Sequence, residues 1–247
     1  MNHLIRKRVF TLFLAGILAI SLAACGNTNS DGNAQDISSE APQTSGQENG
    51  MQSNTSEQVE SSNAGSDGSN ILIAYFTAAE NSGVDAIASA SYTTIDGQAV
   101  GRVRAVADMI QENAGGDLFS IHTSVVYPTD GGELIDYAAE EQDENARPEL
   151  TSHIDNLDQY DTIFIGYPNW WADLPMAVYS FFDEYDFSGK TIIPFNVHNG
   201  SRFSRTIQTI EELEPNATVV EDGFTVSEQT VDQAAPDVAE WLENLGY

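Results

Sequence analysis

The sequence predicts an α/β protein in which helices cover both faces of a parallel β-sheet. Short apolar runs along the chain are typical of strands buried on both faces, and segments with helical spacing of apolar residues separate them. The two kinds of segment alternate five times, which is the pattern of a parallel sheet with crossover helices. Residues 70–247 are long enough to form one core of this kind.

The first half of this region contains two strands and two helices. NILIAYF (70–76) predicts the first strand, because it is apolar and rich in β-branched and aromatic residues. A long irregular stretch follows, and helical spacing then runs from Val100 to the glycines after Ala114. DLFSIHT (117–123) predicts the second strand, and GGELIDYAAEEQDENA (131–146) predicts a polar helix.

The second half continues the alternation. Strands are expected at 161–168, 190–198 and 217–226. Pro194 suggests a bulge or interruption in the second of these, because proline cannot donate a backbone hydrogen bond. Helices are expected at 175–185, 201–213 and 231–246.

The N-terminal segment 1–24 resembles an export signal. Three basic residues precede an apolar run of about 16 residues, shorter than the roughly 20 that a spanning helix needs. Leu22-Ala23-Ala24-Cys25 matches a bacterial lipobox, in which the cysteine becomes the lipid-bearing N-terminus. We therefore expect a lipid on Cys25, and an exported protein anchored to the outer face of the bacterial cytoplasmic membrane. An ordinary transmembrane anchor is the alternative.

Residues 25–69 predict a disordered acidic and polar tether between this anchor and the globular domain at 70–247. Asn, Ser, Gly, Gln and Glu dominate the segment, and it contains no aromatic residue. Such a composition cannot bury enough apolar surface to offset the entropy of ordering it. Cys25 is also the only cysteine, so no disulfide can form within the chain.

The charge of the globular region limits its partners. Residues 70–247 hold six Lys and Arg against 31 Asp and Glu, a formal charge of −25. This excess repels phosphates, so we exclude nucleic-acid binding. A basic redox protein is an expected partner, although the acidity is equally consistent with a role in solubility alone.

Two adjacent tryptophans follow the third predicted strand. Trp170 and Trp171 lie in PNWWAD, and HNGSRFS follows the fourth strand. The carboxyl ends of parallel strands share one edge of a sheet, where ligands bind in folds of this kind. Flat aromatic surface there suits a flat aromatic ligand, since stacking adds about 0.5–1.5 kcal/mol beyond area burial. Core or interface aromatics are the alternative interpretation.

Several of these stretches resemble flavodoxin-like proteins of anaerobic bacteria. The similarity covers nearly all of 71–247 and includes YDTIFIGYPNWWADLP and HNGSRFS; its most specific parts are the Pro-x-Trp-Trp turn and the DFSGKTIIPF strand. It implies a three-layer α/β/α sandwich with a five-stranded parallel sheet in the order 2-1-3-4-5, and FMN as cofactor. It also implies that two loops flank the flavin ring, one formed by Pro168, Asn169, Trp170 and Trp171 and the other by His198, Asn199, Gly200 and Ser201.

The loop that the resemblance assigns to the FMN phosphate departs from the family pattern. Thr77 is in place after the first strand, but the next helix begins GQAVGRVRAV, without a hydroxyl near its start. An insertion of about 20 residues separates the two. The phosphate contacts would then come from backbone amides and from the charge of Arg102, with Thr77, Ala78, Ala79, Val100 and Gly101 as the other candidates.

Two functions are compatible with these features. The first is an FMN-binding protein that transfers electrons or reduces quinone-type substrates, and no G-x-G-x-x-G follows a strand to supply a nicotinamide site. The second is a lipid-anchored binding protein that keeps the fold, has lost FMN and is not an enzyme. His122 and His153 lack partners at ligand spacing, so no metal is expected. No catalytic residue is assigned, and a base role for His198 is the minority interpretation against a structural one.

Overall fold

The computed structural model of the chain describes residues 70–82 and 92–247. The predicted signal segment, Cys25 and the predicted tether lie outside the described residues, as does 83–91. Among the described residues, no helix is both long and apolar enough to cross a membrane. The proposed boundaries of the three segments therefore stay predictions.

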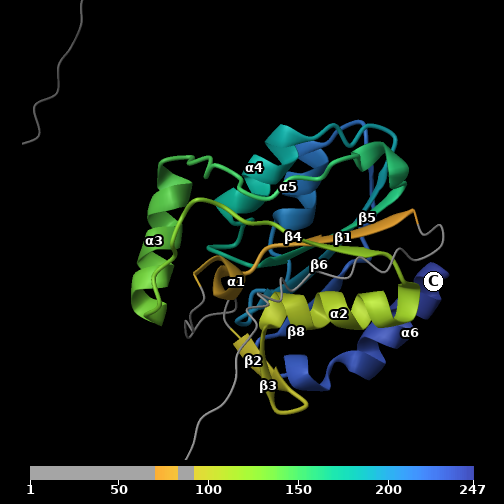
Figure 1. Cartoon of the computed structure of the whole chain (residues 1–247), viewed down its shortest axis with the longest axis horizontal. Helices are drawn as coiled ribbons and strands as arrows, with labels where there is room; N and C mark the ends of the chain where they lie inside the picture. The colour runs from red at the N-terminus through yellow and green to blue at the C-terminus, as the bar shows by residue number, and fades with distance from the viewer. Residues whose placement is uncertain (1–69, 83–91) are drawn as a thin grey trace, which may run out of the picture. The chain divides into compact units, whose positions relative to one another are not determined.

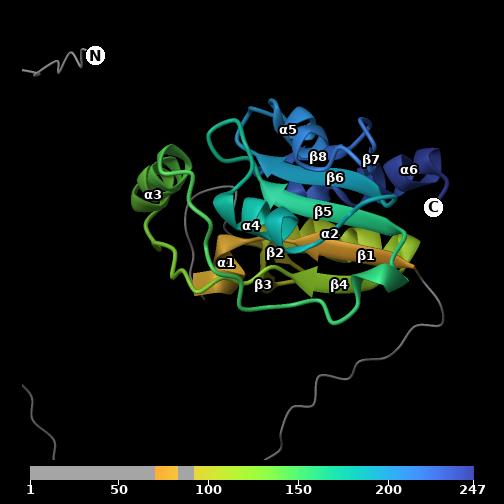
Figure 2. The ribbon, with the colours of Figure 1, turned by 90° about the horizontal axis from the view of Figure 1, so that it is seen from above.

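A parallel sheet forms the middle layer of the described domain (Figure 2). Its spatial order is β4-β1-β5-β6-β7, and β8 also pairs with β6. This is the order 2-1-3-4-5 with the last strand in two pieces, so the predicted fold class is confirmed. The strands are β1 (Ile71–Tyr75), β4 (Asp117–Ser120), β5 (Thr162–Pro168), β6 (Thr191–His198), β7 (Thr218–Val219) and β8 (Phe224–Ser227).

Helices cover both faces of the sheet, as Figure 1 shows. α2 and α6 enclose one core, which includes Ile73 and Val106, whereas α4 and α5 enclose the other, which includes Ile165 and Phe181. α3 lies beyond the ends of the strands toward which the arrows in Figure 2 point. The helices are α1 (Ala78–Ser82), α2 (Arg102–Ala114), α3 (Gly131–Asp143), α4 (Met176–Glu184), α5 (Thr206–Leu213) and α6 (Ala235–Leu245), with short 3₁₀ turns at Leu157–Gln159 and Val231–Gln233.

Pro194 lies within an unbroken β6, which corrects the interruption expected there. It pairs in register with Ile165 of β5. The break falls instead in the neighbouring strand, because β7 ends opposite Ile192 and β8 begins opposite Phe195. Proline has no N–H to donate, so the neighbouring strand is split where β6 lacks a donor.

The stretch expected to be irregular after β1 contains a hairpin and a short helix. β2 (Tyr92–Ile95) and β3 (Gln98–Gly101) pair antiparallel, and α1 follows β1 almost at once. Asp96 and Gly97 form the hairpin turn with φ of 50° and 80°. An Asp-Gly pair is a strong signal for a two-residue turn with positive φ, so the sequence contained the information for this hairpin.

Candidate functional site

A pocket of about 380 Å³ lies at the carboxyl edge of the sheet. This volume falls in the range of small-molecule sites, roughly 300–1,000 Å³. The loops after β5 and β6 form two of its walls, α3 forms a third, and the residue after β8 completes it. The lining residues are Leu134, Ile135, Ala138, Asn169, Trp170, Trp171, Ala172, Asn199, Ser201 and Glu228.

Trp170 forms the inner wall of the pocket. Its side chain is buried, and its ring contacts Phe76 and Tyr127 edge to face, with centroids 5.5 and 5.6 Å away. Edge-to-face geometry is favourable for aromatic pairs. Most of the indole is therefore part of the core, and only a small part of it can meet a ligand.

Trp171 has the opposite environment. It is 58% exposed, and its Nε1–H donates to the backbone carbonyl of Ile135 in α3 at 2.9 Å. The indole therefore spans from the β5 loop to the helix that faces it. Of the two tryptophans, Trp171 is the one that has aromatic surface to offer a ligand.

A tight turn presents Trp171. Trp170 and Asp173 exchange two backbone hydrogen bonds of 3.1 and 2.9 Å, and the two residues between them have φ of 49° (Trp171) and 63° (Ala172). Two-residue turns of this shape favour Asn-Gly, because positive φ costs other residues roughly 1–2 kcal/mol each. Strain of this kind persists only where the surrounding structure holds it, and it is concentrated at functional sites.

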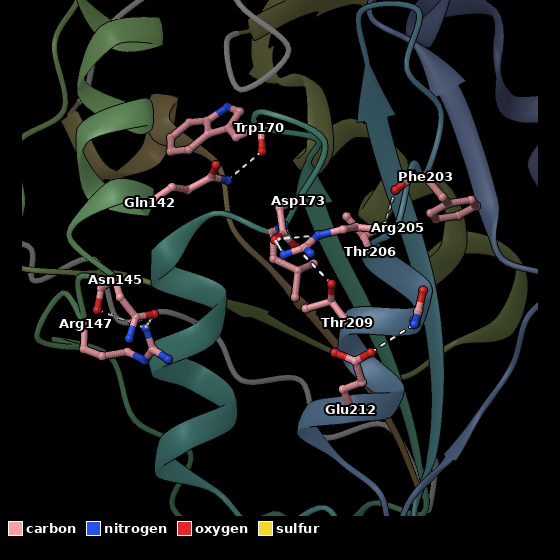
Figure 3. A network of polar contacts seen from close by, with 12 residues as sticks. Gln142, Asn145, Arg147, Trp170, Asp173, Phe203, Arg205, Thr206, Thr209 and Glu212 are labelled. Atoms are coloured by element: carbon pink, nitrogen blue, oxygen red, sulfur yellow. Dashed lines mark hydrogen bonds and ion pairs between the residues drawn. The ribbon is translucent and has the colours of Figure 1, made fainter.

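The Asp173 carboxylate holds this turn against α5 (Figure 3). One of its oxygens accepts from the Leu174 amide at 2.9 Å and from the Thr209 hydroxyl at 3.1 Å, and the other accepts from the Arg205 guanidinium. On the opposite side of the turn, the Gln142 side chain of α3 donates to the Trp170 carbonyl at 2.8 Å. The loop is thus fastened from two helices.

Asn169 joins the loop after β5 to the loop after β6. Its amide nitrogen donates to the Arg202 carbonyl at 2.5 Å, and Asn196 donates to the same oxygen at 3.0 Å. The Asn169 residue lines the pocket, and its Oδ1 atom is buried and has no hydrogen-bond partner among the described residues. A ligand that carries an N–H or O–H donor would satisfy it.

His198 has a structural contact in the second loop. It is buried at the end of β6, and its Nδ1 accepts from the Gly200 amide at 2.8 Å. Burial, and secondarily the charge of Arg202, lowers the pKa of His198, which keeps the imidazole neutral and able to accept. Gly200 has φ of 90°, a conformation that favours glycine. Neither residue lines the pocket, whereas their neighbours Asn199 and Ser201 do.

The α3 wall was not predicted from the sequence. Leu134, Ala138 and Glu141 follow each other at intervals of four and three residues, so they share the buried face of the helix. Burial raises the pKa of Glu141 to about 7. The spacing of Leu134 and Ala138 indicated a helix with one buried face, but nothing in the sequence indicated which segment that face packs against.

The residues predicted to hold a phosphate do not line this pocket. Thr77 is fully buried, and a Cβ added to Gly101 would come within 3.0 Å of its side chain, so β1 and the start of α2 do meet as expected. Ala78 is buried and Ala79 half-buried in the short helix α1. Val100 lines a separate pocket of about 440 Å³ between the hairpin and α2. Pro168, which the resemblance placed beside the flavin ring, is the buried last residue of β5 and does not line the pocket either.

Glu228 links the pocket to Arg102, one of the residues predicted to hold the phosphate, and it was not predicted from the sequence. It follows β8, lines the pocket, and lies 4.0 Å from a guanidinium nitrogen of Arg102, the first residue of α2. Burial raises the pKa of Glu228, and the charge of Arg102 opposes that rise. Its position after a strand at the ligand edge was a signal that could have identified it. Within the described ranges, no cluster of three or more His, Cys, Asp or Glu residues is arranged to hold a metal ion.

The fold and the pocket together define an α/β protein of the flavodoxin type. A family profile described as Flavodoxin matches residues 95–245, which is more than half of the chain. The chain therefore belongs to the flavodoxin family. We found no match to its sequence among curated proteins.

Solved structures from two Bacteroides species share this fold. A candidate flavoprotein from Bacteroides uniformis is 24% identical with a TM-score of 0.56, and the alignment covers 72% of this chain and 99% of that one. A second, from Bacteroides eggerthii, is also 24% identical with a TM-score of 0.51, covering 68% and 97%. A flavoprotein from Lactobacillus acidophilus in complex with FMN is 18% identical with a TM-score of 0.47, covering 66% and 96%.

Proposed function

We propose that this protein is a flavoprotein that binds FMN in the pocket between the β5 and β6 loops and transfers electrons at the outer face of the cytoplasmic membrane. The observation that carries this proposal is the pocket itself, since it joins Asn169, Trp171, Asn199 and Ser201 from the two loops that the family resemblance assigned to a flavin. Family membership supports the same cofactor.

The residues at the ring end fit a planar, partly polar group. Trp171 offers an exposed aromatic face, Leu134 and Ala138 offer apolar surface, and the unpartnered Asn169 Oδ1 offers a buried acceptor. An aromatic wall with a few placed polar atoms is the usual composition of a cofactor site. The hydrogen bonds of Asp173 and Asn169 hold both loops in place, so little reordering would be needed on binding.

The residues predicted to hold the FMN phosphate fit that group less well than the pocket residues fit the flavin ring. Thr77 is buried against Gly101, and Arg102 already faces a carboxylate. The affinity for FMN should therefore come mainly from contacts to the flavin ring. When bound, the flavin would supply the electron chemistry, and the protein would orient it and exclude water from one of its faces.

Titration with FMN tests the proposal. The folded domain, residues 69–247, should bind FMN with quenching of tryptophan emission and a shifted flavin absorption spectrum. Trp171→Ala should weaken binding by about 1–3 kcal/mol, the range for a lost aromatic contact. Trp241→Phe is the matched control, because Trp241 packs against α2 and β8 residues on the other face of the sheet. A folded domain that neither quenches nor perturbs the flavin spectrum would reject the proposal.

A binding protein without FMN is the second candidate. The observation that favours it is the separation of the predicted phosphate residues from the pocket, since Val100 lines a different pocket and Thr77 lines none that is described. The visible spectrum of protein purified from its native host separates the two candidates. A yellow protein with flavin absorption supports the first, and a colourless protein that cannot be reconstituted supports the second.

The membrane anchor is proposed from the sequence. Cys25 ends a lipobox, and a lipid there would place the domain outside the membrane, where a basic redox protein could reach its acidic surface. Cys25→Ser removes the acceptor thiol, so the full-length chain should leave the membrane fraction or remain unprocessed. If the variant is still processed and membrane-bound, the lipoprotein assignment is wrong.

A further inference from the structure

Glu228 is the one charged side chain among the described residues that line the pocket. It is mostly buried, with 14% of its side chain exposed, and its Oε2 atom has no hydrogen-bond partner within the described part of the chain. A desolvated carboxylate at the wall of a ligand site acts strongly on any charge that enters, because the local dielectric constant is low.

The cations at the start of α2 are already engaged with carboxylates. Arg102 lies 4.0 Å from Glu228, and Arg104 donates to Asp108 at 2.6 Å and lies 3.7 Å from Glu80. The positive charge of these two residues at the start of α2 is therefore matched by negative charge. A phosphate at this end would have to compete with Glu228 for Arg102, at a short distance from the Glu228 carboxylate.

From this arrangement we infer that Glu228 is a specificity-determining residue that opposes a ligand phosphate, so that the pocket takes the uncharged flavin, riboflavin, about as well as FMN. This inference rests on the proposed flavin function and refines its ligand class. Riboflavin has the same ring and the same hydroxylated chain as FMN, and it ends in a hydroxyl where FMN has a phosphate. The Glu228 carboxylate repels the phosphate and has no such effect on the hydroxyl.

The test compares FMN and riboflavin affinities, measured by calorimetry or by tryptophan quenching, in the wild type and in Glu228→Gln. We expect the two wild-type affinities to lie within about tenfold of each other. In Glu228→Gln, which keeps the shape and removes the charge, the FMN affinity should rise by about tenfold or more while the riboflavin affinity changes by less than about threefold. Glu221→Gln, an exposed residue on the turn between β7 and β8, is the control for net charge and should move neither affinity.

The outcomes separate this inference from the proposed function. If riboflavin binds and Glu228→Gln changes both affinities equally or neither, the inference fails and the flavin function stands. Wild-type FMN affinity more than about a hundredfold above that of riboflavin would also overturn the inference. If neither flavin binds the folded wild type, the proposed function fails and the inference fails with it. Glu228→Ser serves as a second variant if thermal unfolding shows that the glutamine variant is not folded.

Discussion

The two regions that meet the carboxyl edge of the sheet are built in different ways. The loops after β5 and β6 are fastened by side-chain hydrogen bonds from Asp173, Gln142 and Asn169, and they enclose a pocket. The chain after β1 instead enters a short helix and later a hairpin, and its predicted ligand residue Thr77 is buried. The loops after β5 and β6 line an open pocket, whereas Thr77 after β1 is packed in the interior.

We propose from this difference that recognition of the flavin ring and recognition of the phosphate are separable in this protein. The loop after β5 has positive φ at Trp171 and Ala172, whereas the region after β1 has positive φ at a non-glycine residue only at Asp96, in the hairpin turn, among its described residues. A site of this kind can keep the flavin ring while its contacts to the phosphate weaken.

The two tryptophans should differ most in stability. Trp170→Ala removes a buried ring that contacts Phe76 and Tyr127, so it should lower the free energy of unfolding by about 3–5 kcal/mol. Trp171→Ala removes an exposed ring and should lower it by less than about 1 kcal/mol. Urea denaturation of both variants measures the difference. Equal losses would contradict the assignment of one tryptophan to the core and the other to the site.

The α3 wall should depend on pH through Glu141. The pKa of Glu141 is raised to about 7 in the folded protein from an ordinary value of 4.5, so the folded state binds a proton more tightly than the unfolded state. The contribution of Glu141 to the free energy of unfolding is fully present below about pH 4.5 and is lost as the pH rises toward 7. Glu141→Gln stays neutral, so its stability relative to the wild type should increase over that window, by on the order of 2 kcal/mol.

Urea denaturation at pH 5 and pH 8 measures this change. Glu140→Gln is the matched control, because Glu140 is exposed on the same helix and should show little change between the two pH values. If the stability of Glu141→Gln relative to the wild type is the same at both pH values, the buried carboxyl does not titrate as described.

Arg102 should affect only the binding of the FMN phosphate. Arg102→Ala removes the cation beside Glu228, so the remaining carboxylate should lower FMN affinity by about 1 kcal/mol and leave riboflavin affinity unchanged. Paired titrations with the two flavins measure this effect. A similar loss for both ligands would place Arg102 in the support of the ring pocket and weaken the separation of the two ends.

Ala172 should give the smallest effect. Its φ of 63° is strained for alanine and easy for glycine, so Ala172→Gly should stabilise the fold by about 0.5–1 kcal/mol. Thermal unfolding measures the change. Ala99→Gly is the control, because Ala99 lies in the hairpin strand β3, where glycine should destabilise the fold. If Ala172→Gly is destabilising, the turn does not hold the strain described for it.

Particular residues show how far the sequence could predict the site. The edge on which Asn169, Trp171, Asn199 and Ser201 meet follows from strand direction, and the structure brings all four to one pocket. The turn at Asp96-Gly97 was readable from local chemistry, although the hairpin was not expected. Ile135 and Glu228 come from segments about 90 residues apart, and no local pattern relates them.

The fold class and the two loops that face the ligand edge could be predicted from the sequence alone, and the strand order could be predicted from its family resemblance. The fold class and the position of the two loops depend on hydrophobic period and chain direction, which are local properties of the chain. Three features depend on the packing of distant segments: Trp170 is buried and Trp171 exposed, α3 forms a wall of the pocket, and Glu228 lies beside Arg102. Adjacent residues of the same type carry the same local signal, so their environments differ only because distant segments pack against one of them and leave the other in contact with water.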